Sequence, residues 1–407
     1  MLWRSLFILV LALLAAFSAP ARAATETAFD ARAFEGALAR LKAHPEVAAS
    51  NARAEALSHA ADGALGLPDP MLFIAEQDLP LGASTSQDFE QKMLGVRQQV
   101  PAFGTRSAKA ARATLESRKT RLAARYAFAR LKARLITTLA GLHSLKQQER
   151  LLAAQLALTA TERQSLTGRI AADRGRVSEL AAIDAETARI DLARAELDER
   201  RHELQEVLRS LLGDAPELVP PPLATLAGPP DPERTYPVLL AADEMAMAAA
   251  DVDLRAAEFA PAFELQASAG RMRNGDNSAS FMVGVSIPLW AADSQAPNLR
   301  AAEGLRNAAA LERDLQRREV RTTLAHLRLQ ITTSEKKSQL WSTKITSLTG
   351  GRDALRRDYA AGKAELTDTL KAARDILDAR MALFEEEARH TALIADYNRY
   401  FVTGEGS

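Results

Sequence analysis

The chain has 407 residues, with 52 basic and 52 acidic side chains and no cysteine. This charge balance gives no electrostatic reason to expect nucleic acid as a partner. The absence of cysteine excludes disulfides, thiolate metal sites and a lipid anchor on cysteine. Aromatic residues make up only 5% of the chain, while alanine, leucine, arginine and glutamate dominate long tracts. That composition is typical of long helices and coiled coils.

The N-terminal residues predict a secretory signal peptide over residues 1–23. Arg4 precedes an apolar run over 6–17, which is followed by the small-x-small site Ala21-Arg22-Ala23. The run is shorter than the roughly 20 residues of a transmembrane helix. We therefore expect cleavage after Ala23, which leaves a mature chain with two more acidic than basic residues. An uncleaved membrane anchor is the alternative.

The distribution of proline predicts long helices on both sides of a linker. Residues 102–215 and 298–407 contain no proline, whereas residues 213–232 contain seven. A proline cluster stops helices and forms an extended connector. A single helix over 105–167 would be roughly 95 Å long and would have to pack lengthwise against other helices.

Similar landmarks recur at a nearly constant distance along the chain. Pro70 and Pro261 are 191 residues apart, and Pro101 and Pro288 are 187 apart. This spacing predicts a duplication, with a first repeat over 24–212, the linker over 213–232 and a second repeat over 233–407. Chance similarity between alanine-rich helices is the alternative.

Each repeat contains a stretch that favours a β-hairpin. The first hairpin is predicted at 71–101, with strands at 71–80 and 91–101, and the second at 262–288, with strands at 262–271 and 280–288. In the last strand, apolar residues alternate with small or polar ones. Strands of about ten residues can cross an outer membrane when tilted. A surface hairpin of a soluble domain is the alternative.

The strand count then predicts an oligomer. Four strands per chain are too few, because a barrel in a bilayer needs about eight or more. Two chains would give eight strands, and three would give twelve.

No pattern of catalytic or metal-binding residues stands out. The six histidines are scattered, without a pair at helical i, i+3 or i+4 spacing, and no glycine-rich phosphate loop occurs. We therefore expect neither an enzyme nor a cofactor.

The chain resembles the TolC-type outer-membrane efflux protein family over nearly all of its mature length. The most specific resemblance is Tyr359-x-x-Gly362, followed by Leu366-x-x-x-Leu370 and Ala379-Arg380. Residues 98–106 resemble the family's exit from strand to helix. Residues 66–72 are similar to the branch that serves heavy-metal efflux pumps.

This resemblance implies a mixed, predominantly α fold. Long coiled-coil helices would form an α-barrel in the periplasm, and a homotrimer would complete a twelve-stranded transmembrane β-barrel in the outer membrane. The function implied is that of the exit duct of a tripartite efflux or secretion system, with metal cations as one candidate cargo. Implied partners are a periplasmic adaptor and an inner-membrane pump, commonly proton-driven.

The resemblance also implies a gate at the helix turns furthest from the membrane. Tyr359 matches a gating tyrosine that ties neighbouring helix pairs together, and Asp368 matches an acidic lumen position, of which three copies would attract cations. Glu179 and Glu365 occupy equivalent places after the turn glycines Gly175 and Gly362, so both should lie near the tip.

Two departures from the family pattern allow a second interpretation of the gate residues. Ala364 stands where an arginine partner can occur, and Lys371 where a second acidic residue can. Asp368 would then simply pair with Lys371 or Arg374 on a solvated helix face.

The alternative function is a soluble periplasmic coiled-coil adaptor or scaffold protein. Such proteins also have long helical hairpins, but usually carry a separate β-rich domain. Here the predicted strands are confined to one hairpin in each repeat, which favours the channel.

Overall fold

The computed structural model describes residues 29–77, 91–173, 176–214, 217–225 and 231–402. The predicted signal peptide, the loop between the first two strands and Gly175 lie outside the described residues. The chain divides into two compact units, which are described separately. Unit 1 consists of Met1–Ala39, Leu135–Ala224 and Trp341–Thr391, and unit 2 of Arg40–Arg134, Thr225–Leu340 and Ala392–Ser407.

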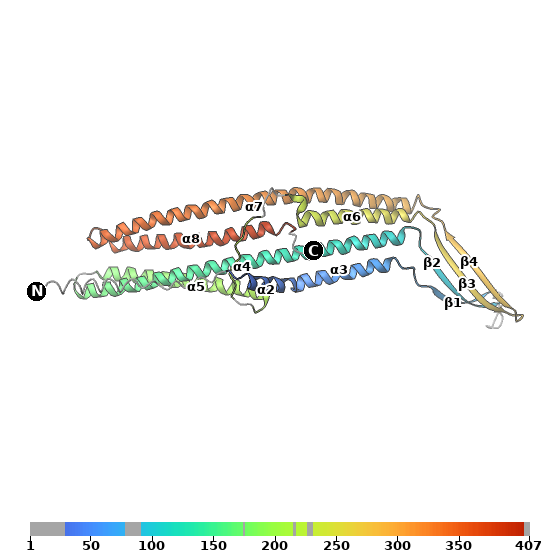
Figure 1. The fold of residues 1–407 in the computed structure, drawn as a ribbon, viewed down its shortest axis with the longest axis horizontal. Helices are drawn as coiled ribbons and strands as arrows, with labels where there is room; N and C mark the ends of the chain where they lie inside the picture. Colours follow the sequence, from blue (N-terminus) through green and yellow to red (C-terminus); the bar gives the residue numbers. More distant parts are fainter. Residues whose placement is uncertain (1–28, 78–90, 174–175, 215–216, 226–230, 403–407) are drawn as a thin grey trace. The chain divides into compact units, whose positions relative to one another are not determined.

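The described chain is mostly helical (Figure 1). Its elements are α2 Ala31–Lys42, α3 Pro45–Ala64, α4 Thr105–Ala171, α5 Val177–Leu212, the 3₁₀ turn η1 Pro232–Arg234, α6 Tyr236–Ala257, α7 Gln295–Ala360 and α8 Leu366–Asn398. Helix α4 begins at the predicted residue and ends four residues beyond the predicted end. With 67 residues it is about 100 Å long at 1.5 Å per residue.

Prolines mark three of the helix starts. Pro45 is in the first turn of α3, where His44 caps the helix and its Nδ1 accepts a hydrogen bond from the Glu46 N–H at 3.3 Å. Helix α6 likewise has a proline in its first turn. Helix α7 begins three residues before the proline-free tract and includes Pro297 in its first turn. Proline is tolerated there because the N–H it lacks has no partner within the helix.

None of the helices in the described part of the chain is both long enough and apolar enough to cross a membrane.

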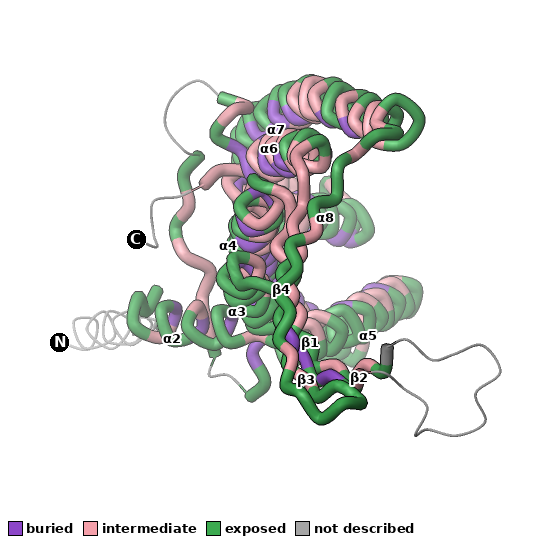
Figure 2. The backbone as a smooth tube through the Cα atoms, turned by 90° about the vertical axis from the view of Figure 1, so that its right-hand side faces the viewer, coloured by how far each residue is buried: buried purple, intermediate pink, exposed green. Residues whose placement is uncertain are grey.

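The four strands form one antiparallel sheet in the order β1-β2-β3-β4 (Figure 1). They are β1 Met71–Gln77, β2 Gln91–Val100, β3 Ala262–Met272 and β4 Asn277–Ser286. The central pairing of β2 with β3 joins the two hairpins, although the two strands come from opposite halves of the chain. Figure 2 colours most of β4 as exposed.

The predicted boundaries of the last strand were wrong at both ends. Strand β4 begins at Asn277, not at 280, because a tight turn closes the second hairpin. Gly275 has φ of 93°, and the Met272 N–H donates to the Asp276 carbonyl at 2.8 Å. The strand ends at Ser286, since Pro288 has no N–H to donate to a ladder.

Ion pairs align α4 with α6 within unit 2. Arg112 Nε lies 2.7 Å from Asp251 Oδ1, and Lys119 pairs with Glu244. Asp243, which is only 6% exposed, pairs with Arg118. From the first of these pairs to the second, the residue numbers increase along α4 while they decrease along α6, as expected for antiparallel helices.

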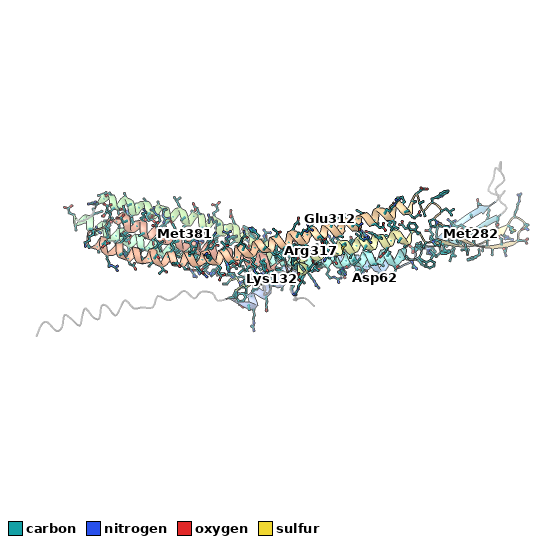
Figure 3. The ribbon with its side chains drawn as sticks, turned by 90° about the horizontal axis from the view of Figure 1, so that it is seen from above. Asp62, Lys132, Met282, Glu312, Arg317 and Met381 are labelled. Atoms are coloured by element: carbon teal, nitrogen blue, oxygen red, sulfur yellow. The ribbon has the colours of Figure 1, made fainter. Side chains whose placement is uncertain are left out.

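Helix α7 is tied to η1 in the same unit. Glu233 accepts a hydrogen bond from Arg313 at 2.8 Å and one from Arg317, which is labelled in Figure 3, at 3.4 Å. The Tyr236 N–H donates to the Tyr400 carbonyl at 2.8 Å, which ties the C-terminal segment to the start of α6.

The core of unit 1 consists of leucine and isoleucine from α4, α5 and α8. One cluster of buried residues is Leu145, Leu152, Ile190, Leu197 and Leu377. Its α4 residues, Leu145 and Leu152, are seven positions apart and so lie on one side of the helix. Helices of this length are stabilised by such packing more than by their intrinsic propensity.

Candidate functional site

One face of the sheet is apolar and exposed. Residues directly opposite each other on neighbouring strands share a face. The register therefore places on one side Leu72, Ile74, Leu94, Val96, Val100, Phe263, Leu265, Ala267, Ala269, Ala279, Phe281, Val283 and Val285, which we call the apolar face, with Gln98 as a polar residue among them. Leu72 is 73% exposed, Ile74 80% and Phe281 71%. Soluble monomers rarely expose a continuous apolar patch of this kind, which marks a membrane or protein contact.

The opposite face carries most of the polar and small residues, together with five large apolar ones, Met71, Phe73, Met93, Met272 and Met282, the last of which is labelled in Figure 3. Arg97 Nε lies 3.2 Å from Glu264 Oε1, and its guanidinium lies 5.5 Å from the centre of the Phe73 ring. The hydroxyls of Ser268 and Ser280 are 2.7 Å apart. On this polar face Arg97 and Glu264 form an ion pair. On the apolar face the Phe103 ring contacts Phe263 at one end, and the other residues named above are exposed, apart from the half-buried Gln98 and Val100.

Phe73 also explains a glycine on the polar face. A Cβ built on Gly95 would lie 2.4 Å from the Phe73 ring, which is too close for any side chain. Phe73 thus lies directly over β2 and covers the backbone there.

The second candidate site lies in unit 1, at the turns between α4 and α5 and between α7 and α8. Asp173, in the first turn, has a positive φ of 58°, and Gly362, in the second, has φ of 71°. Glycine adopts that left-handed conformation without steric cost, and it commonly ends helices in this way. The Gly362 N–H donates to the Tyr359 carbonyl at 3.0 Å.

Tyr359 and Glu179 are brought together by Arg169 of α4. Arg169 Nη1 donates to the Tyr359 hydroxyl at 2.6 Å, and the guanidinium lies 5.4 Å from the centre of the tyrosine ring. Arg169 Nη2 also lies 3.7 Å from Glu179 Oε2. The tyrosine ring packs beside a buried cluster that includes Leu166 and Ile183. Arg169 therefore connects α4, α5 and α7.

Asp368 caps a helix in the structure. Its Oδ2 accepts a hydrogen bond from the Glu365 N–H at 3.4 Å, and both side chains are exposed. A carboxylate in the first turn is also favoured by the helix dipole. Among the described residues, Asp368 forms no ion pair with Lys371 or Arg374, so the predicted pairing on a solvated face is not what this structure contains.

The expected equivalence of Glu179 and Glu365 differs from the geometry. Glu179 is the third residue of α5, and its carboxylate accepts a hydrogen bond from the Arg176 N–H at 3.4 Å. Asp368 is the third residue of α8 and bonds its helix start in the same way. By position in the helix, Glu179 therefore corresponds to Asp368. The expected equivalence counted residues from the turn glycines Gly175 and Gly362. It does not hold because α8 begins four residues after Gly362, whereas α5 begins two residues after Gly175.

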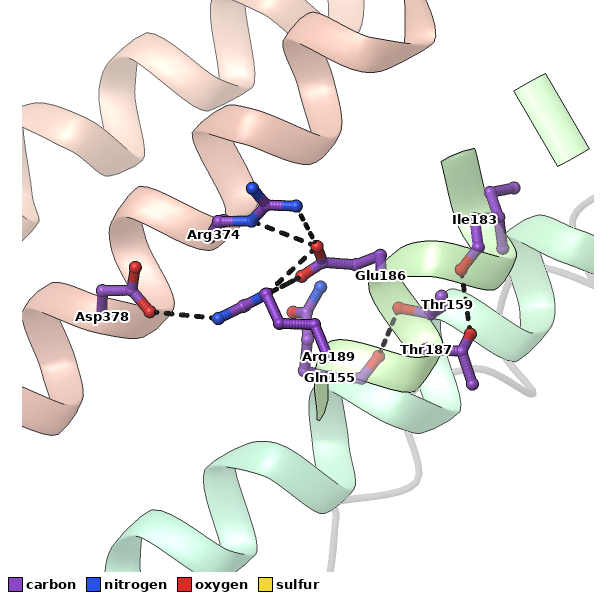
Figure 4. A network of polar contacts seen from close by, with 8 residues as sticks. All are labelled: Gln155, Thr159, Ile183, Glu186, Thr187, Arg189, Arg374 and Asp378. Carbon is purple, nitrogen blue, oxygen red and sulfur yellow. Dashed lines mark hydrogen bonds and ion pairs between the residues drawn. The ribbon is translucent and has the colours of Figure 1, made fainter. Parts of the chain in front are cut away.

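Sequence reasoning missed a buried ionic network that joins α5 to α8 (Figure 4). Glu186 is only 1% exposed and accepts hydrogen bonds from Arg189 Nη2 at 2.8 Å and Arg374 Nε at 3.1 Å. Arg189 Nη1 also reaches Asp378 Oδ1 at 3.5 Å. Glu186 and Arg189 are three residues apart, which is common on helices, and nothing in the sequence indicates that Arg374 approaches them.

Burial and hydrogen bonding act on Glu186 in opposite directions. Burial raises the pKa of its carboxyl, but hydrogen bonds from Arg189 and Arg374 and their charges lower the pKa by more. The net result is a pKa below the ordinary glutamate value, so the carboxylate is charged in the folded protein.

A groove of about 320 Å³ runs beside Tyr359 between α4, α7 and α8. Burial raises the pKa of Glu162 on its wall, and the charge of Arg356 partly opposes this. Within the ranges that the structure describes, no group of three or more histidine, aspartate or glutamate side chains is placed to hold a metal ion.

The fold is that of outer-membrane channel proteins. The crystal structure of CusC aligns with a TM-score of 0.78 and 13% identity, over 91% of this chain and 92% of that one. The outer-membrane channel OprN aligns with a TM-score of 0.76 and 17% identity, over 90% and 89%. The outer membrane protein VceC of Vibrio cholerae aligns with a TM-score of 0.71 and 16% identity, over 90% and 95%.

The family comparison points in the same direction. Residues 237–395 match the family model described as outer membrane efflux protein. The match lies in the second predicted repeat and includes the Tyr359 turn. No curated protein sequence matches the chain.

Proposed function

We propose that this protein is the outer-membrane channel subunit of a TolC-type tripartite efflux system. The observation that carries the proposal is the apolar face, a band of exposed aliphatic and aromatic side chains across all four strands. A lipid bilayer accepts such a face, while the polar face lines an aqueous lumen. The family match over residues 237–395 supports the same conclusion.

The sheet edges support assembly with further copies. Strand β1 pairs only with β2, and β4 only with β3, among the described residues. A bilayer tolerates no open edge, because its interior cannot hydrogen-bond free N–H and C=O groups. Three copies would close a twelve-stranded β-barrel, and the long helices of three copies would form the α-barrel through the periplasm. We therefore propose a homotrimer.

The remaining parts of the proposal follow from this role. A signal peptide over 1–23 would direct export, and two repeats joined by the linker at 213–232 would supply matched hairpins. A periplasmic adaptor and an inner-membrane pump, proton-driven, would deliver the substrate to a passive duct that needs no catalytic group or cofactor. Metal cations are the candidate cargo suggested by residues 66–72. The gate would lie at the turns that contain Tyr359, Asp368, Glu365 and Glu179.

The test combines fractionation with conductance. The full chain, expressed with its native N-terminus, should be found in the outer-membrane fraction as a heat-labile oligomer. After purification it should conduct ions in planar bilayers. A chain that washes off with the soluble periplasmic proteins and forms no conducting pore would instead support the adaptor or scaffold function.

A further inference from the structure

One row of the sheet places charge on the same side as the apolar face. Strand pairing places Glu76, Lys92, Arg271 and Asn277 side by side across the four strands. On this face the next row toward the helices is Ile74, Leu94, Ala269 and Ala279. We call Glu76, Lys92, Arg271 and Asn277 the charged row. It lies at the end of the sheet where the second hairpin turns, away from the strand ends that lead into α3, α4, α6 and α7.

Two cations are directly opposite each other in this row. Lys92 pairs with Arg271 in the ladder, and like charges in that position repel. Glu76, the ladder neighbour of Lys92, is the acidic residue of this row. Its carboxylate lies 3.7 Å from Lys92 Nζ, and both side chains are well exposed. Arg271 Nε donates to the Gly275 carbonyl at 3.2 Å, a neutral acceptor, and no carboxylate of the described chain contacts Arg271.

The other end of the apolar face has different chemistry. Phe263 is in the row nearest the helices, and its ring meets that of Phe103 edge-on, with centroids 6.1 Å apart. Trp290, just beyond β4, is 75% exposed. Aromatic side chains are typical of the level where a bilayer meets water. The apolar face thus extends from an aromatic boundary to a charged one, in which Lys92 and Arg271 are neighbours.

We propose that Lys92 and Arg271 bind the phosphate groups of lipid headgroups in the leaflet that covers the charged row. This rests on the proposed function, in which the apolar face borders lipid and the hairpin turns point to the cell surface. A guanidinium matches phosphate with two parallel hydrogen bonds, and an ammonium adds a point charge. A phosphate group between Lys92 and Arg271 has the charge opposite to both side chains, while the acyl chains of the same lipid cover Leu94, Ala269 and the rows beyond.

The test compares one lipid with and without its phosphates. The full chain in nonionic detergent is titrated with bisphosphorylated lipid A, and separately with the same lipid after removal of both phosphates. Native mass spectrometry then counts the lipids bound per oligomer. We expect the phosphorylated lipid to bind roughly tenfold tighter or more, as two basic residues near an anionic surface would give. Inorganic phosphate, which has no acyl chains, should not compete at similar concentration.

The double variant Lys92→Gln/Arg271→Gln should lose this preference and still bind lipid. Arg97→Gln is the matched control, because it removes a cation from the same strand on the polar face; it should keep the preference. Equal binding of both lipids by the natural chain, an unchanged preference in the double variant, or displacement by inorganic phosphate would overturn the inference. A chain that binds neither lipid and stays in the aqueous fraction would overturn the proposed function as well.

Discussion

At the scale of single residues, Glu186 is the most deeply buried charged side chain in the described part of the chain, at 1% exposed. Its carboxylate is almost fully buried between two guanidiniums that are themselves partly exposed. Removing one member of a buried ionic group costs stability, since its partners stay desolvated without a counter-charge. The network therefore fixes how α5 and α8 pack in unit 1.

Glu186→Gln should lower the free energy of unfolding by roughly 1–3 kcal/mol, less than for a fully buried pair because Arg189 and Arg374 reach solvent. Denaturant titration followed by circular dichroism measures this. Asp378→Asn is the control, since its carboxylate is 57% exposed, and it should cost less than about 0.5 kcal/mol. Equal decreases in the free energy of unfolding in both variants would mean that the burial of Glu186 does not add to stability.

The lowered pKa of Glu186 also predicts a pH dependence. A carboxyl with a depressed folded pKa stabilises the protein above its unfolded pKa, and loses that contribution as pH falls through the folded value. The stability difference between the natural chain and Glu186→Gln should therefore be constant near neutral pH and shrink in acid, below the ordinary glutamate pKa. Denaturation of both proteins across an acid series measures it, and a difference that grows in acid would contradict the assigned direction.

Tyr359→Phe should loosen the closed state of the channel, because it removes the hydrogen bond from Arg169 while keeping the ring that Arg169 covers. The expected cost is about 1 kcal/mol per chain, seen in single-channel recordings as more frequent opening. Tyr397→Phe, in unit 2, controls for loss of a tyrosine hydroxyl as such. Identical recordings from both variants would return Tyr359 to an ordinary packing role.

Asp368→Asn should reduce cation preference while leaving the fold intact. Asparagine can still accept the hydrogen bond from the Glu365 N–H, so the cap survives although the charge does not. Reversal potentials under a salt gradient measure the change, with Asp358→Asn, an exposed α7 residue, as control. Unchanged selectivity in the Asp368 variant would mean that no acidic ring forms there.

The sequence predicted part of the helix-turn site. It selected Tyr359 and Glu179, and the structure brings them close to each other through Arg169, which the sequence did not select. Arg169 is one arginine among many on long helices, and its importance arises from the packing of α4 on α7. Contacts between distant helices depend on relative rotation and shift, which single-helix periodicity does not specify.

At the scale of elements, the strands were predicted better than their turns. Alternation of apolar with small or polar residues indicated the last strand, because one exposed apolar face needs a period of two, and its match in the first repeat indicated the other hairpin. The second turn was predicted too long, since Asn277, Ser278 and Ala279 look polar or small and yet pair in the ladder. Polarity alone does not separate a loop from the end of a strand.

The register gives a sharp test of which face meets lipid. Val283 and Met282 are neighbours on β4, are 51% and 49% exposed, and point to opposite faces. Val283→Arg should reduce assembly strongly, because arginine in the middle of a bilayer costs about 2–4 kcal/mol. Met282→Arg, facing the lumen, should assemble nearly normally. Oligomer yield in outer-membrane fractions measures both, and a defect limited to Met282→Arg would reverse the assignment of the faces.

At the scale of the whole molecule, the two hairpins depend on each other through the pairing of β2 with β3. A chain truncated after Gly213 keeps β1 and β2 and loses β3 and β4. An isolated two-stranded hairpin is at best marginally stable. The truncated chain should therefore fail to form conducting pores in planar bilayers, with the full chain as control. A conducting half-length chain would contradict both the strand count and the need for two unlike hairpins.

The pairing of β2 with β3 also sets the order of events during synthesis and export. Val100 pairs with Phe263, more than 160 residues later, so the first hairpin must wait for most of the chain before its inner edge is covered. Contacts so distant in sequence form slowly. Throughout that interval Leu94 and Val96 remain on a strand that has β1 on one side and an open edge on the other, which is the type of surface that aggregates. The protein is therefore expected to need a periplasmic holding chaperone whose release is timed by the arrival of β3.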